Sequence, residues 1–187
     1  MGNLTTFLNN FSEFTPDAVN DLNCCIVEES FLKGDVLVQK GRVCGKLIYI
    51  KKGLVKLSFE GDYKEFIMRF FSENALSTVL DSFLNQTPSS YRIVAIEPTE
   101  ISYITFYKIE ELCRKHHCVE AAFRKFIAHA STNMMARISE MLEEDGTQRY
   151  HNFLKQNPSL MQRISLGDLA SYLGITQVSL SRIRSKQ

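Results

Sequence analysis

The sequence predicts an α+β protein in which a β-rich segment lies between two helical segments. Residues 4–30 repeat apolar side chains at the spacing of a helix. From Phe31 the pattern changes to short β-rich runs, which glycine-containing turns interrupt about every eight to twelve residues. After Phe106 the helical spacing returns and continues toward the C-terminus. With 187 residues the chain can hold one large or two small domains.

The N-terminal segment is expected to hold two helices. The first presents one apolar face, made of Leu4, Phe7, Leu8, Phe11 and Phe14. The second opens at Thr15-Pro16-Asp17, with proline in its first turn. Its apolar face continues through Ala18, Leu22 and Ile26, so we expect helix to residue 30.

The β-rich segment predicts a barrel or a sandwich, because its strands are short and its turn signals are regular. The clearest strands are Val36–Val38, Leu47–Ile50, Leu54–Phe59, Glu65–Phe71 and, as the last one, Ile101–Phe106. The chain then turns helical to about Glu144, where Asp145-Gly146 is expected to end the helix and mark a hinge.

Apolar residues in this helix are spaced close to the heptad pattern of a two-helix coiled coil. They are Phe123, Ile127, Ala130, Met134, Ile138 and Met141. The spacing predicts a homodimer interface through residues 119–142. The alternative is a helix that packs on the β-rich segment of its own chain.

The C-terminal segment predicts two short helices joined by a tight turn, after a helix over Thr147–Gln156 that Asn157-Pro158 ends. Leu166–Leu173 forms the first, with an inner face made of Leu166, Leu169, Ala170 and Leu173. Gly174 suits the turn, and Thr176 suits the N-cap of the second helix. Any β-wing must come before the second helix or be very reduced, and Met161–Ile164 has room for only a minimal ribbon.

The second helix turns Leu180 and Ile183 inward with Ile175. Its outer side then carries Gln177, Val178, Ser181, Arg182, Arg184 and Lys186. Amide, hydroxyl and guanidinium groups at the start of a helix suit the DNA major groove. The alternative interpretation is a helical hairpin that caps a core with a solvated basic end.

Charge and cysteine content narrow the class of protein. Residues 146–187 hold six of the 22 basic residues and one of the 21 acidic ones, a net of +5 that leaves −4 for the rest. A basic segment on a mildly acidic body is typical of a DNA-binding module on a sensor.

Five cysteines without a CxxC pair predict free thiols. Cys113 and His117, even with one more group, would make only an incomplete metal site, so we interpret the segment from Cys113 to Cys118 as a solvated helix end.

Several classes are disfavoured. No stretch approaches the roughly 20 apolar residues of a membrane span, and the N-terminal residues do not fit a secretory signal. No histidine precedes His116, and the chain has no GxSxG, Walker or HExxH motif, which argues against a cupin-like metal protein and against other enzymes. We therefore expect a cytoplasmic protein without catalytic residues, metal or cofactor.

The segment LxxLAxYLGIT-xxSLSRIR resembles the helix-turn-helix of the Crp/Fnr family of bacterial transcription regulators, most closely its short Bacteroidetes-type members. LKGDVLVQKG and LIYIKKGLVKL resemble the β-roll of the same family. The resemblance implies a double-stranded, jelly-roll-like β-roll sensor domain in residues 1–112. It also implies a dimerisation helix in residues 113–145 and a winged-helix or helix-turn-helix DNA-binding domain in residues 146–187.

Carried over to this chain, the resemblance implies a set of DNA-contacting residues. They are Thr176, Gln177, Val178, Ser179, Ser181, Arg182, Arg184 and Lys186. Arg182 matches the guanine-reading arginine, whereas Gln177 and Val178 replace the usual Arg and Glu and leave the operator sequence open. Expected phosphate contacts are Lys155, Arg163, Arg184 and Lys186.

The nucleotide-binding members of that family hold the cyclic phosphate with a Gly-Glu pair, a short helix and an Arg-Ser/Thr pair. Here Glu73 matches the glutamate, but Ser89 and Ser90 stand where the arginine pair is expected, and strand alternation aims Arg92 elsewhere. The missing arginine argues against cyclic AMP. The expected effector pocket comprises Phe71, Glu73, Ser89, Ser90 and Tyr91.

These observations together predict a homodimeric, sequence-specific transcription regulator that binds a roughly palindromic site on double-stranded DNA. It would respond to a small-molecule effector other than cyclic AMP, and RNA polymerase is a candidate partner. The alternative is an effector-binding or protein-interaction sensor whose β-roll has lost specific DNA binding.

Overall fold

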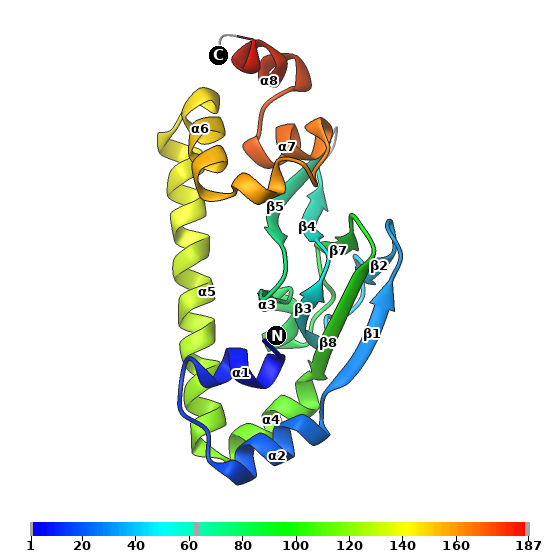
Figure 1. Cartoon of the computed structure of the whole chain (residues 1–187), viewed down its shortest axis with the longest axis vertical. Helices are drawn as coiled ribbons and strands as arrows, with labels where there is room; N and C mark the ends of the chain where they lie inside the picture. Colours follow the sequence, from blue (N-terminus) through cyan, green and yellow to red (C-terminus); the bar gives the residue numbers. More distant parts are fainter. Residues whose placement is uncertain (1, 62–63, 186–187) are drawn as a thin grey trace.

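A computed structural model describes residues 2–61 and 64–185 (Figure 1). Its strands are β1 (Val27–Phe31), β2 (Val36–Val38), β3 (Lys46–Lys52), β4 (Val55–Glu60), β5 (Glu65–Phe71), β6 (Leu76–Ser77), β7 (Arg92–Ala95) and β8 (Thr99–Thr105). Its helices are α1 (Leu4–Asn9), α2 (Pro16–Cys24), α3 (Leu80–Asn85), α4 (Phe106–Lys115), α5 (His117–Glu143), α6 (Gly146–Gln156), η1 (Pro158–Leu160), α7 (Leu166–Leu173) and α8 (Gln177–Arg184).

The strands form two antiparallel four-stranded sheets that face each other, which confirms the predicted β-roll. Their orders are β1-β8-β3-β6 and β2-β7-β4-β5. Strand β3 contributes to two hydrophobic cores, because its successive side chains point to opposite faces of the sheet. Ile48 and Ile50 point into the core between the sheets, whereas Leu47 and Tyr49 point to the helical side.

The helical side of the first sheet is covered by α1, α2, α4 and the first half of α5. Leu4 and Leu8 of α1 are fully buried there with Phe126 of α5. The two predicted N-terminal helices are confirmed, but the prediction of helix to residue 30 is wrong. Residues Val27–Phe31 form β1 and pair antiparallel with β8, from Val27↔Tyr103 to Phe31↔Thr99. Pairing with an otherwise open sheet edge satisfies backbone groups, which outweighs a weak helical pattern.

Two predicted boundaries after the β-roll also need correction. Strand β8 ends at Thr105, and Phe106 already begins α4. The expected helix to Glu144 is broken at His116, whose backbone is extended and whose ring nitrogen lies 2.6 Å from Asp21.

All five cysteines are free thiols, and burial raises the pKa of Cys113 to about 11.

Asp145-Gly146 does not end α5 in the expected way. Glu144 is the extended C-cap, and Asp145 is the N-cap of α6, where its side chain accepts hydrogen bonds from the backbone of Thr147 and Gln148. The Gln148 side chain accepts from the Asp145 backbone N–H, which completes a capping box. The junction therefore starts the next helix through a side-chain cap and does not depend on glycine.

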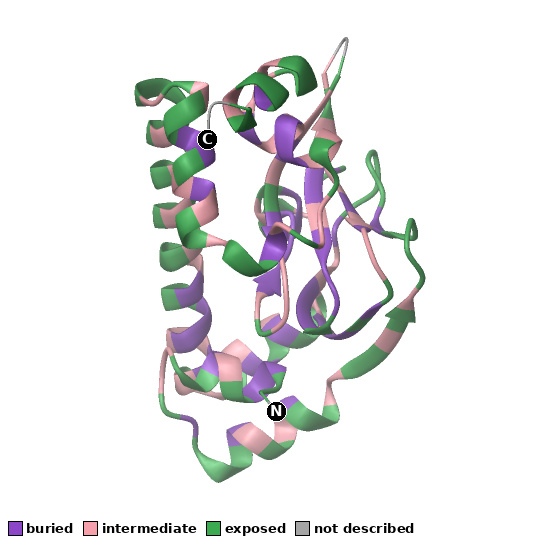
Figure 2. Ribbon diagram, turned by 45° about the horizontal axis from the view of Figure 1, so that its top comes forward, coloured by how far each residue is buried: buried purple, intermediate pink, exposed green. Residues whose placement is uncertain are grey.

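The C-terminal helices pack against the second sheet through a third core. Leu54 and Phe70 of the β-roll side contribute to it together with Tyr150, Phe153 and Leu173. Figure 2 shows buried residues where α7 meets β5. One prediction is wrong here, because Leu166 is 50% exposed and the inner face of α7 is Leu169, Ala170 and Leu173. Residues 161–164 form turns and hold no ribbon, which agrees with the expectation that any wing is very reduced there.

Candidate DNA interface and effector cleft

Helices α7 and α8 are each delimited by local sequence signals. The Ser165 hydroxyl caps α7 by accepting a hydrogen bond from the Asp168 N–H at 3.0 Å. Gly174 ends α7 with φ of 70°, a left-handed conformation that glycine adopts without steric cost. The Thr176 hydroxyl caps α8 by accepting from the Ser179 N–H at 3.1 Å. The predicted caps and turn are confirmed at each of these positions.

Helix α8 separates an inner face from an outer face. Leu180 is 1% exposed in the third core, and Ile183 and Ile175 pack partly against it. The outer face consists of Thr176, Gln177, Val178, Ser181, Arg182 and Arg184, all exposed. Ser179 is half-buried, and its hydroxyl lies 3.0 Å from that of Thr176. Lys186 lies outside the described residues.

The cations of α8 remain available to a ligand. Neither Arg182 nor Arg184 forms an ion pair within the part of the chain that the structure describes. Figure 1 shows α8 at the end of the molecule, with α7 between it and β5. An external molecule can therefore approach the outer face of α8 without displacing another element.

The expected phosphate contact of Arg163 is wrong, because the β-roll holds this side chain through Glu73 and Glu97. Its terminal nitrogens donate to the two carboxylate oxygens of Glu73 at 2.9 and 2.8 Å, and its Nε donates to Glu97 at 3.2 Å. Those hydrogen bonds lower the pKa of Glu73 to about 2, which partial burial of the carboxylate opposes. This fork geometry ties the turn before α7 to the loops that follow β5 and β7.

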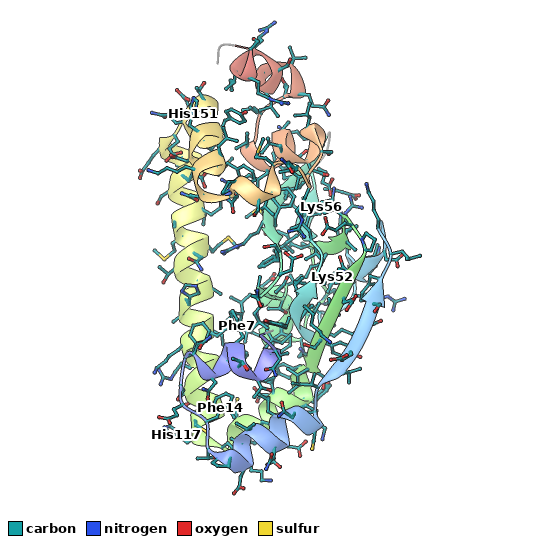
Figure 3. All side chains as sticks on the ribbon, in the orientation of Figure 1. Phe7, Phe14, Lys52, Lys56, His117 and His151 are labelled. Carbon is teal, nitrogen blue, oxygen red and sulfur yellow. The ribbon has the colours of Figure 1, made fainter. Side chains whose placement is uncertain are left out.

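A second ion-pair cluster ties α7 itself to the β-roll. Lys56 of β4 lies 2.7 Å from Asp168 and 2.9 Å from Glu65, and only 13% of its side chain is exposed. Figure 3 shows Lys56 beside α7. The guanidinium of Arg149 is also buried and donates to the backbone carbonyls of Glu144 and Leu173. Much of the charge of residues 146–187 is therefore internal.

Arg163→Gln is expected to lower the free energy of unfolding by about 1–3 kcal/mol at pH 7, because Glu73 and Glu97 lose a charged hydrogen-bond donor. The depressed pKa of Glu73 contributes stability that is present above pH 4.5 and is lost as the pH falls toward 2. In denaturant unfolding at several pH values, the free energy of unfolding of the variant should therefore fall less than that of the wild type as the pH is lowered. Lys155→Gln removes an exposed charge as the control, and equal stability of the two variants would contradict the role of Arg163.

A cleft of about 1250 Å³ separates α5 from the β-roll and the C-terminal helices. Phe7 of α1 lines it, and Figure 3 shows this side chain between α1 and the β-roll. Other lining residues come from β5 and the segment after it, from α5, and from α6 to η1. The cleft is therefore formed by elements that lie far apart in the sequence.

The structure brings together only part of the predicted effector pocket. Phe71 and Tyr91 line the cleft, whereas Glu73, Ser89 and Ser90 do not. The Glu73 carboxylate binds Arg163 and accepts a hydrogen bond from the Gly53 N–H. The buried Ser89 hydroxyl bonds the backbone of Tyr91, and Ser90 is exposed.

Sequence reasoning missed the α5 wall of the cleft and Arg69. The apolar spacing over Ala130, Met134 and Ile138 could have indicated this wall, because all three residues line the cleft. Arg69 carried no such signal, since strand alternation alone does not say which face of β5 meets α5.

The predicted seam on α5 divides into two parts. Phe123, Ile127 and Ala130 pack on the core of their own chain, as the alternative interpretation required. Met134, Ile138 and Met141 are exposed. Met135 and Leu142, which lie seven residues apart, are 70% and 81% exposed. The C-terminal half of α5 thus leaves Met135 and Leu142 largely exposed, whereas Met134 and Ile138 line the cleft and the Met141 methyl group lies close to Gly174 of its own chain.

Comparison with known proteins identifies the β-roll. Residues 28–116 match the family model of the cyclic nucleotide-binding domain. No curated protein matches the chain at a significant level. A structure from Eubacterium rectale, titled as a transcriptional regulator of the Crp/Fnr family, shares 15% identity with a TM-score of 0.74, over 93% of this chain and 83% of that one.

Two further solved structures are similar over most of the chain. The c-di-GMP responsive global regulator CLP of Xanthomonas campestris shares 16% identity with a TM-score of 0.68, over 92% of this chain and 91% of that one. The catabolite activator protein of Thermus thermophilus shares 18% identity with a TM-score of 0.61, over 96% and 85%.

The β-roll, the long helix and these similarities define the class of protein. The β-roll in residues 28–116 is similar to cyclic nucleotide-binding domains. The chain as a whole has the fold of the Crp/Fnr transcriptional regulators, which confirms the resemblance seen in its motifs. These similar proteins are named as regulators or as an activator protein. No helix in the described residues is long and apolar enough to cross a bilayer.

Proposed function

We propose that the protein is a sequence-specific, DNA-binding transcription regulator in which α7 and α8 form a helix-turn-helix. The observation that carries this proposal is the outer face of α8. It is capped and packed on one side, and on the other side it exposes amide, hydroxyl and guanidinium groups that form no ion pair with any described residue. A helix with these properties fits the major groove.

The chemistry of each exposed side chain on α8 suggests its role in DNA binding. Arg182 has the geometry to donate two hydrogen bonds to a guanine edge, and Gln177 can pair in the same way with adenine. Val178 supplies an apolar surface for a thymine methyl group. Arg184 and the exposed Lys155 are the phosphate contacts that remain after Arg163 is assigned to the β-roll.

The exposed half of α5 supports a homodimer. Apolar side chains at a heptad-like spacing are stable in water when a second helix covers them. Two copies joined there would place two α8 helices on half-sites about 34 Å apart, which predicts a roughly palindromic operator. In this role the protein acts in the cytoplasm, and RNA polymerase is a candidate partner.

We further propose that the cleft beside α5 binds a small-molecule effector other than cyclic AMP. Support comes from Ser89 and Ser90, which offer no cation for a cyclic phosphate, and from Glu73, whose carboxylate is already occupied. The cleft is equally compatible with the alternative, a sensor that acts without DNA. The next experiment distinguishes this alternative from the DNA-binding regulator.

Arg182→Ala is expected to weaken specific DNA binding by about 1–3 kcal/mol and to relax preference at one base pair, because the bidentate contact to one base is lost. We would select bound duplexes from a random pool with wild-type protein and with this variant. Lys155→Ala is the matched control, and it should weaken binding to all sequences alike and reduce the salt dependence.

A palindrome enriched by the wild type and degenerate at one position for Arg182→Ala is the expected outcome. An unchanged motif would remove Arg182 from base reading. Failure to enrich any motif, with and without cyclic AMP, would favour the sensor that has lost specific DNA binding.

A further inference from the structure

The lining of the cleft is chemically uneven. Most of its surface is apolar on both sides. The β-roll side contributes Leu57, Met68, Phe71, Val79 and Tyr91, and α5 contributes Ala130, Met134 and Ile138. A surface of this kind gains free energy when an apolar ligand body displaces water from it. Binding sites for small molecules typically combine such walls with a few placed polar groups.

Arg69 is the cation of the cleft that has no internal anion. It lies on β5 opposite Leu57, and its guanidinium carbon is 5.6 Å from the centre of the Phe71 ring. Within the described residues it forms no ion pair. Arg137 also lines the cleft, but it pairs with Glu140 at 2.6 Å and donates to the Tyr172 carbonyl.

No carboxylate of the cleft forms an ion pair with Arg69 within the described residues. Glu140 is bound to Arg137, and Glu144 accepts two hydrogen bonds from Asn152. Asp81 and Glu143 are exposed and form no ion pair within the described part of the chain. Burial raises the pKa of Tyr172; the charge of Arg137 opposes that rise, Glu140 adds to it, and Arg69 again opposes it. Arg69 thus lies near Tyr172 without an ion pair of its own among the described residues.

We propose that the cleft binds an amphipathic organic anion, with an aromatic or alkyl body against the apolar walls and one anionic group paired with Arg69. This inference rests on the proposed effector role and names the chemical class of the effector. A carboxylate or sulfonate accepts two parallel hydrogen bonds from a guanidinium, which adds geometric specificity to the charge attraction. The stacking of Arg69 near Phe71 presents this donor next to an aromatic surface.

The first experiment uses 8-anilinonaphthalene-1-sulfonate as a fluorescent probe of the 187-residue chain, which has no tryptophan to interfere. Wild type should bind the probe saturably, and Arg69→Gln should weaken binding about 10- to 100-fold because a charged hydrogen bond is lost. Arg69→Lys, which keeps the charge without the fork, should fall in between. Arg114→Gln is the matched control, because Arg114 is 80% exposed and lies outside the cleft.

Displacement of the probe tests the chemical class. Decanoate should compete with it in the wild type, whereas decanol should compete poorly. Equal probe affinities of wild type and Arg69→Gln would overturn the proposal, as would equal competition by the acid and the alcohol or the absence of saturable binding. Unfolding curves of each variant establish that it is folded.

The probe-binding test and the DNA-selection test have independent outcomes. The probe is titrated in the absence of DNA, so a protein that binds it through Arg69 but enriches no DNA motif would keep the effector class and lose the DNA role. A protein that enriches a motif but shows no dependence on Arg69 would keep the DNA role and lose the effector class.

Discussion

Replacing both Met135 and Leu142 by glutamate is expected to convert the protein to a monomer and to weaken specific DNA binding by about 10²- to 10⁴-fold. Both side chains are more than two-thirds exposed on α5, so the substitution should leave the fold of each subunit intact. Two carboxylates facing their copies across a helical seam repel each other and lose water when they are buried. The dimer would then dissociate, and each α8 would bind DNA without the gain from its partner.

Molar mass from light scattering and affinity for the selected operator would measure the two effects on one sample. Neither Met135 nor Leu142 lines the cleft, so probe binding should remain close to that of the wild type. The matched control is Leu32→Glu with Tyr107→Glu, which adds the same charge at side chains 73% and 75% exposed away from α5. A glutamate variant of α5 that stays dimeric would show that the dimer forms elsewhere.

Gly53→Ala is expected to lower the free energy of unfolding by about 2–5 kcal/mol, the sum of a left-handed backbone cost and a steric clash. Gly53 has φ of 101°, and a Cβ there would lie 2.6 Å from the Pro98 carbonyl oxygen and 2.7 Å from the Thr99 Cα. Because these are backbone atoms, the β3–β4 turn would have to move. That movement would also disturb the Gly53 N–H that donates to Glu73 at 2.9 Å.

Gly34→Ala separates the two contributions. Gly34 has a similar φ of 95°, but no atom lies within 4 Å of the added Cβ. Its loss should be limited to the left-handed cost of about 1–2 kcal/mol. Denaturant unfolding of both variants measures the difference, and equal losses would mean that the turn accommodates the methyl group without strain.

Local signals in the sequence were sufficient for the C-terminal helices. Ser165, Gly174 and Thr176 act within one helical turn of their own position, so the bounds of α7 and α8 follow from short-range hydrogen bonds and backbone preferences. The same holds for β5, whose predicted bounds Glu65–Phe71 are those of the structure. Strand β1 was missed because its partner β8 lies about 70 residues later in the chain.

The candidate site, too, was predictable only where it depends on residues close together in the sequence. The exposed face of α8 follows from helical periodicity, since Leu180 fixes which side is inward. The assignment of Arg163 to DNA phosphate failed because its partners, Glu73 and Glu97, are 90 and 66 residues away. Likewise, only the approach of α5 to β5 decides that Phe71 and Tyr91 line a cleft while Ser89 does not.

The sequence by itself determined the class of fold, the order of its segments and the polar face of α8, because periodicity, caps and turns depend on neighbouring residues. Only the tertiary structure decided which charges are free. Arg163, Lys56 and Arg149 are held by groups distant in the chain, whereas Arg182 and Arg69 have no ion pair within the part of the chain that the structure describes. A charge becomes available to a ligand only after all internal partners have been brought within hydrogen-bonding distance, and that depends on the packing of the whole chain.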